Sequence, residues 1–275
     1  MFEKKLNSFS FALTIFALLE ILVSWPKFIW IISFLAFVFI FFFVWKILPK
    51  NISTRQGLRN SRSLIFKITK IAKIFVEEKN YFFLASPIFL LCGAILFLMF
   101  LENDILMHLS ILLFSFIFFL FSESLFANFY DYQSQSYPLE NVLTGINLLA
   151  LFLIYSHIFL FLALFHFSLW IMLPFLILTT FVSTFQLFYI YKIARKINYF
   201  YSIIATIIIL EIFWSIMFLP TNFYVNGLIL INVYYIIIGM SYFYFTEVLA
   251  KARVVRHLLI SLIIIILTLA TAKWA

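Results

Sequence analysis

The chain has 275 residues, of which 66% are hydrophobic and 11% are charged. This leaves too little polar surface to coat a soluble globule of that size, so the composition excludes a soluble protein and predicts one that uses lipid as its solvent. The formal net charge of +8 would suggest a nucleic-acid partner for a soluble protein, but cations between membrane spans are explained by orientation in the bilayer, and we expect no nucleic-acid binding.

Nine apolar runs are long enough to cross a bilayer, since about 20 mostly apolar residues span ~30 Å of hydrocarbon. We therefore expect an all-α integral membrane protein, a polytopic helical bundle that forms one transmembrane domain over residues 1–275. The predicted spans cover residues 8–24, 28–48, 81–101, 105–126, 142–165, 168–191, 199–219, 227–249 and 257–273.

The first of these runs follows Lys4 and Lys5 and so resembles a signal peptide at first sight. No small-x-small cleavage pattern follows the run, and Glu20 interrupts it, so we expect a first span that the protein keeps. Pro26 and Lys27 end this span, because proline cannot donate a backbone hydrogen bond and lysine resists burial in lipid.

The segment over residues 49–80, between the second and third spans, is the longest polar stretch of the chain, and residues 46–81 hold nine of the nineteen Lys and Arg residues. Over residues 62–76 most apolar side chains fall on one side of a helical wheel, which predicts a cytoplasmic amphipathic helix at the membrane interface. Its cations would lie over anionic lipid. They include Arg62, Lys67, Lys70 and Lys73.

Three roles stay open for this basic segment. It is a linker that only fixes the orientation of the neighbouring spans, a helix that regulates the protein or docks a protein partner, or a site for an acidic ligand such as a phosphorylated one. No glycine-rich phosphate loop accompanies the cations, which argues against the third role. The partners we expect are a bilayer with anionic lipids and, at residues 49–80, a protein.

The later spans are separated by short polar breaks. Glu102 to Asp104 divides an apolar stretch that is too long for one crossing, and the pair His166 and Ser168 divides another. A turn over residues 220–226, which begins with a proline, precedes the span predicted to start at Gly227.

The distribution of Lys and Arg residues predicts the orientation of the chain. If the N-terminus is cytoplasmic, nine crossings place seventeen of the nineteen on the cytoplasmic side and only Lys27 and Lys273 outside. A wrong span count would move the later basic clusters to the opposite side from the first. We therefore expect a multi-pass protein with its N-terminus in the cytoplasm and its C-terminus outside.

Three ionisable residues lie at one predicted depth inside the membrane. Counted from the cytoplasmic end of each span at about 1.5 Å per residue, Glu20 lies at roughly 20 Å, His157 at roughly 22 Å and Glu211 at roughly 18 Å. Thr179 and Thr180 fall at a similar level. Carboxylates beside an imidazole could form a proton-coupled site, because ionisable groups at membrane depth mark transport pathways and histidine exchanges protons near neutral pH.

A structural interpretation of the same residues stays open. A lone glutamate in a span often bonds a hydroxyl of a neighbouring helix, and a histidine that faces another helix often serves packing alone. A shared depth also leaves the position around the bundle undetermined.

Motifs for known membrane chemistry are missing from the sequence. It contains no zinc-protease, serine-hydrolase or phosphate-loop motif. Asn128 and Asp131 stand alone, whereas a prenyltransferase needs aspartate-rich motifs, and the single Cys92 excludes an intrachain disulfide or a cysteine-rich metal site. We therefore expect no metal and no cofactor, and the sequence argues against an enzyme.

The C-terminal third carries a resemblance over about sixty residues. The segment from Leu219 to Asn226, the pair Tyr234 and Tyr235, the run from Arg253 to Arg256 and the end from Thr271 to Trp274 resemble uncharacterised multi-spanning inner-membrane proteins of bacteria with small genomes. The resemblance implies a bacterial cytoplasmic membrane, and it brings no activity or functional residues.

Three functions follow as hypotheses. The first is a non-catalytic membrane component that scaffolds or anchors partners, which the missing motifs and the basic amphipathic helix favour. The second is a small transporter or permease subunit that uses the glutamates and the histidine within the membrane. The third is a membrane-embedded enzyme that acts on a lipid-linked substrate.

Overall fold

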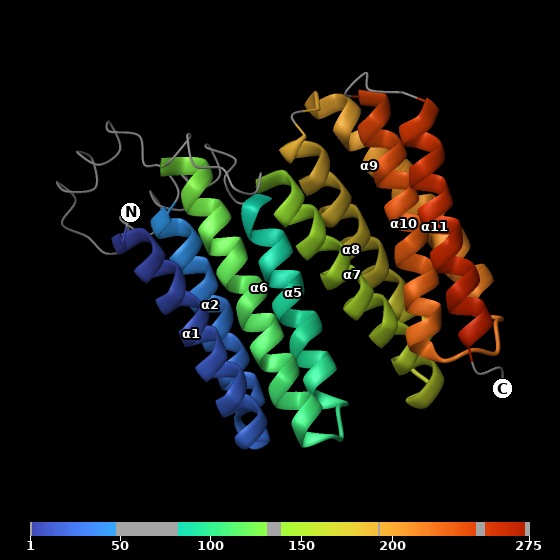
Figure 1. Cartoon of the computed structure of the whole chain (residues 1–275). Coiled ribbons are helices and arrows are strands. Elements are labelled where there is room, and N and C mark those ends of the chain that lie inside the picture. The colour runs from blue at the N-terminus through green and yellow to red at the C-terminus, as the bar shows by residue number, and fades with distance from the viewer. Residues whose placement is uncertain (1, 48–81, 131–138, 192, 246–250, 273–275) are drawn as a thin grey trace. The chain divides into compact units, whose positions relative to one another are not determined.

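A computed structural model describes residues 2–47, 82–130, 139–191, 193–245 and 251–272 (Figure 1). These residues contain no strand, and they hold nine helices that are long and apolar enough to cross a membrane. The prediction of an all-α polytopic membrane protein is confirmed. The helices are α1 (Phe2–Ser24), α2 (Ile29–Ile47), α5 (Phe82–Met99), α6 (Asp104–Tyr130), α7 (Leu139–Leu164), α8 (Leu169–Ile190), α9 (Arg195–Ile216), α10 (Phe223–Phe245) and α11 (Lys251–Thr271).

The breaks between helices have the local causes that the sequence predicts. A short 3-10 turn, Pro26–Phe28, separates α1 from α2. The side chain of Asn103 accepts a hydrogen bond from the Leu106 backbone at 3.1 Å and so caps the start of α6. His166, between α7 and α8, has a φ of 50°, a left-handed conformation that reverses the chain direction within a few residues.

Two helices begin several residues before the spans predicted for them. Helix α10 begins at Phe223 rather than Gly227, because Pro220 ends the preceding turn and the Asn222 side chain accepts a hydrogen bond from the Tyr224 backbone at 3.2 Å. Helix α11 begins at Lys251 rather than His257, since cationic side chains in a first turn reach water at the membrane surface and do not end a helix.

The chain packs as two compact units. Unit 1 comprises residues 1–88 and 108–142, with helices α1, α2 and most of α6, and unit 2 comprises residues 89–107 and 143–275, with most of α5 and helices α7 to α11. One transmembrane domain over the whole chain stays a prediction. The basic segment 49–80 and the amphipathic helix predicted at 62–76 lie outside the described residues.

Aromatic rings form the core of unit 1. Phe11 on α1 is fully buried, and its ring stacks on Phe39 of α2 with centroids 5.5 Å apart. The same ring meets Phe118 of α6 edge to face at 6.1 Å. Phe43 and Phe126 meet edge to face at 6.0 Å. Since lipid is as apolar as these side chains, the close fit of the rings and not their removal from water holds the three helices together.

Glycines let three helices of unit 2 approach closely. A Cβ atom on Gly227 of α10 would lie 2.9 Å from the Cα atom of Ser156 on α7, and one on Gly93 of α5 would lie 2.8 Å from the Cβ atom of Leu153. Real Cβ atoms do not come this close to such atoms, so both contacts require glycine. Small residues at helix contacts are the usual means of close packing in membranes.

Candidate functional site

Hydroxyl side chains form a buried stripe along α8. Thr179, Thr180, Ser183 and Thr184 are all buried. Three of them donate to carbonyls one turn earlier in the same helix: Thr179 to Phe175 at 2.7 Å, Thr180 to Leu176 at 2.7 Å and Thr184 to Thr180 at 2.7 Å. Such bonds let a helix present oxygen atoms to its neighbours without leaving a hydroxyl proton unpaired.

Two fully buried tyrosines meet this stripe from neighbouring helices. The Tyr155 hydroxyl of α7 lies 2.7 Å from the Thr180 Oγ1 atom, in hydrogen-bond contact. The Tyr234 hydroxyl of α10 lies 3.5 Å from the Thr184 Oγ1 atom. The three helices are therefore joined by hydroxyl contacts near the middle of their length.

Asn147 completes this group in the N-terminal half of α7. Its Nδ2 atom donates to the Ser183 backbone carbonyl at 3.1 Å. The Asn147 Oδ1 and Ser183 Oγ atoms are buried and have no hydrogen-bond partner among the described residues. Buried polar atoms are rarely left in this state, so these two atoms mark a place where a small polar molecule could bind.

We name these residues the central polar cluster of unit 2. Its members are Asn147, Tyr155, Thr180, Ser183, Thr184 and Tyr234. All are uncharged at neutral pH, and each is buried within one unit. The cluster offers hydroxyl and amide groups to a neutral polar molecule.

Asparagines also bridge two further helix pairs of unit 2. Asn198 of α9 donates from Nδ2 to the Phe185 carbonyl of α8 at 3.0 Å, and its Oδ1 atom accepts from the Ser202 hydroxyl at 3.1 Å. Asn232 of α10 donates from Nδ2 to the Ser261 carbonyl of α11 at 2.9 Å. An amide that bonds a backbone carbonyl of a neighbouring helix thus recurs along the unit and fixes the helices to one another.

His157 is buried in α7, as a candidate site residue should be, but it lies outside the central polar cluster. Its Nδ1 atom lies 2.6 Å from the Leu153 carbonyl, and its ring centroid lies 5.7 Å from that of Phe100. It lies two positions after Tyr155, which places the two side chains about 200° apart around the helix. His157 therefore faces another set of neighbours than Tyr155 does.

Glu211 lies on the opposite face of α9 from the packed one. The buried positions of this helix include Thr206, Ile209, Phe213 and Ile216, which are spaced by three or four residues, whereas Glu211 is exposed on the protein surface. No hydrogen bond or ion pair between described residues joins it to His157. The spacing of apolar residues in α9 is the signal in the sequence that could have predicted this position.

Glu20 forms an ion pair that sequence reasoning missed. The Nδ1 atom of His108 on α6 lies 3.0 Å from the Glu20 Oε1 atom of α1, within unit 1. Each residue lies four positions, about 6 Å, from a helix end: Glu20 before the end of α1 and His108 after the start of α6. Depths counted from the C-terminal end of the first span and the N-terminal end of the fourth would have predicted the pair.

The five residues predicted to share a site therefore occupy several places. Thr180 belongs to the central polar cluster, and Thr179 lies beside it on α8. His157 and Glu211 lie elsewhere in unit 2, and Glu20 lies in unit 1. Within the described ranges, no group of three or more His, Cys, Asp and Glu residues could hold a metal ion. The cationic candidates Arg62, Lys67, Lys70 and Lys73 lie outside these ranges.

Comparison of the chain with protein-family models, with curated proteins and with solved structures finds no match. The candidate functions therefore depend on the residues and on the geometry of each unit.

Proposed function

We propose that the chain is a non-catalytic membrane component that anchors a protein partner at the cytoplasmic membrane of a bacterium. The observation that carries the proposal is the use of polar side chains in unit 2. Asn147, Asn198 and Asn232 each donate to a backbone carbonyl of a neighbouring helix. Side chains used in this way stabilise a fixed bundle, which is what an anchor requires.

The distribution of charge supports the same proposal. With the N-terminus in the cytoplasm and the C-terminus outside, the basic segment 49–80 is the largest cytoplasmic connection of the chain. It carries no predicted catalytic motif, and its cations suit an acidic protein surface or anionic lipid. We propose that this segment binds the partner while the helices hold it at the membrane.

A crosslinking experiment tests this function. A variant with Lys67, Lys70 and Lys73 changed to Gln should lose specific partners that the wild-type protein captures in its native membrane. The control changes Lys4, Lys5 and Lys196 to Gln, which removes equal charge from other cytoplasmic positions and should keep those partners. An unchanged partner list in the first variant, with normal membrane insertion, would refute the proposal.

A second candidate function is the transport of a small neutral polar solute through unit 2. The Asn147 Oδ1 and Ser183 Oγ atoms favour it, because both are buried in the membrane-spanning region without a partner among the described residues. Proteoliposomes that contain the wild-type protein should then admit glycerol or urea faster than empty vesicles in a stopped-flow swelling assay. Asn147→Leu should abolish the difference, while Ser115→Ala, in unit 1, should not. Equal rates with and without the protein exclude this function for these solutes.

A further inference from the structure

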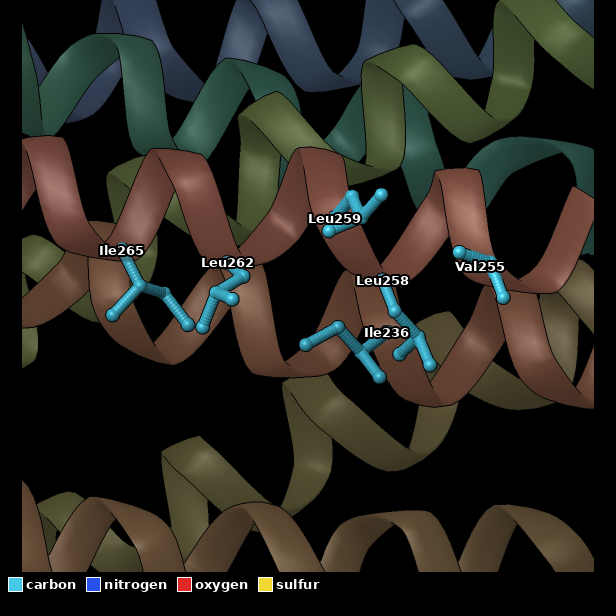
Figure 2. A pocket seen from close by; sticks show the side chains of 6 residues that line it. All are labelled: Ile236, Val255, Leu258, Leu259, Leu262 and Ile265. Carbon is cyan, nitrogen blue, oxygen red and sulfur yellow. The ribbon is translucent and has the colours of Figure 1, made fainter.

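An apolar groove runs along the contact between α10 and α11 (Figure 2). Its volume is about 320 Å³, within the range of about 300–1,000 Å³ that is typical of small-molecule sites. Five of its six lining residues belong to α11, and Ile236 of α10 forms the opposite side. The lining residues are Ile236, Val255, Leu258, Leu259, Leu262 and Ile265.

The groove exists because the face of α11 that packs on α10 is narrow and is not the face that lines the groove. His257, Ser261 and Thr268 are the buried residues of α11. His257 lies directly over Gly239, where a Cβ atom would overlap the imidazole ring, and the Ser261 backbone carbonyl accepts the hydrogen bond from Asn232. These contacts bring the two helices close along one line. The larger apolar side chains of α11 lie beside that line.

The length of the groove matches one leaflet of a bilayer. From Val255 to Ile265 the helix rises about 15 Å, at about 1.5 Å per residue. The hydrocarbon core of a bilayer is about 30 Å thick, so this is about half of it. Counted from Lys251, the groove covers about 6 to 21 Å of the helix, mostly in the half at which α11 begins, and so it suits an acyl chain of that leaflet.

A cation lies at the surface end of the groove. Lys251 precedes Val255 by four residues and Leu258 by seven, which places it on the same face of α11 as the groove. Its side chain is exposed. The start of a helix adds its own partial positive charge. An apolar groove with positive charge at its surface end is complementary to a lipid with an anionic headgroup.

We propose that the groove binds one acyl chain of an anionic phospholipid from the leaflet in which α11 begins. The chain lies against Ile236, Leu258 and Leu262, and the headgroup phosphate pairs with Lys251. Charge selects the lipid class, because a zwitterionic lipid fills the groove with its chain but gains less from this cation.

Native mass spectrometry after reconstitution in an equimolar mixture of phosphatidylglycerol and phosphatidylcholine tests the headgroup contact. The wild-type protein should retain more phosphatidylglycerol than phosphatidylcholine. The variant Lys251→Gln should reduce that ratio by about fivefold. The matched control Arg253→Gln removes one charge from the same end of α11, about 180° around the helix from the groove. Equal ratios in the variant and the control would overturn the proposal.

A second pair of variants tests the chain contact without changing charge. Leu262→Trp adds a large side chain within the groove, whereas Ile260→Trp adds it on the other side of α11, where Ile260 is exposed. Both positions are at the protein surface, so the two variants should elute as wild type in gel filtration. The Leu262 variant should retain less phosphatidylglycerol and the Ile260 variant the wild-type amount. Equal retention by both would show that the groove does not hold the chain.

Discussion

The two units bury polar groups in different ways. In unit 1 two buried serines bond their own helix: Ser115 donates to the Ile111 carbonyl at 2.8 Å and Ser122 to the Phe119 carbonyl at 2.9 Å. In unit 2 the buried amides and tyrosines bond neighbouring helices, as Asn147 does with Ser183 at 3.1 Å. Both arrangements satisfy hydrogen bonds in a medium without water, but only the second fixes one helix against another.

This difference has an energetic consequence. Between helices in lipid the hydrophobic effect contributes little, so association depends on close packing and on hydrogen bonds between helices. Unit 1 has close packing of aromatic rings, as at Phe11 and Phe118. Unit 2 adds the amide bridges and the glycine contacts at Gly93 and Gly227. We therefore expect unit 2 to tolerate substitutions at its helix contacts less well than unit 1 does.

The largest effect is expected at Gly227. In Gly227→Ala the added methyl group would meet the Cα and N atoms of Ser156 at 2.9 Å, and backbone atoms cannot turn aside, so α10 must move away from α7. Overpacking of this kind typically costs about 1–3 kcal/mol. A thermal unfolding series of the protein in detergent should show a clearly lower midpoint than for the wild type.

Gly145 supplies the matched control for that substitution. It also lies within a helix, α7, but a Cβ atom built on it meets nothing within 4 Å. Gly145→Ala should therefore leave stability unchanged or raise it by about 0.5–1 kcal/mol, because alanine is the better helix former. A Gly227 variant as stable as the Gly145 variant would contradict the close helix contact.

The next effect concerns the amide bridges. Asn232→Leu removes the bond to the Ser261 carbonyl and should lower the free energy of unfolding by about 0.6–2 kcal/mol, the range measured for hydrogen bonds between membrane helices. Ser115→Ala in unit 1 removes a bond within one helix and should change it by less. Steric-trapping measurements of both variants in bicelles compare the two values. Equal losses would remove the proposed difference between the units.

The sequence predicts most of the helices because their signals are local. Apolar runs of sufficient length, the proline at position 26 and the polar residues 102–104 each act within a few positions, and the nine helices follow from them. The helix starts were less accurate, since Lys251 looks like a loop residue although it lies in the first turn of α11. Side chains that reach the membrane surface do not mark a helix end.

The candidate site was harder to predict because depth alone does not define a place in a bundle. Glu211 and His157 have similar predicted depths, but Glu211 faces away from the packed side of α9. The central polar cluster consists of neutral residues such as Asn147 and Tyr155, which draw less attention in an apolar sequence than charges do. Their meeting depends on which faces of α7, α8 and α10 are in contact, and one sequence does not contain that information.

The smallest effect is expected for the ion pair of unit 1. Glu20 and His108 lie at the surface, with about 26% and 56% of their side chains exposed, and exposed pairs contribute about 0.2–1 kcal/mol. In a double-mutant cycle with Glu20→Gln and His108→Gln, the coupling energy should therefore be smaller than the loss in Asn232→Leu. Thermal unfolding of the four proteins at one pH and salt concentration gives that energy. A coupling larger than the Asn232 effect would mean that unit 1, too, depends on a polar contact between helices, and the contrast between the two units would then be wrong.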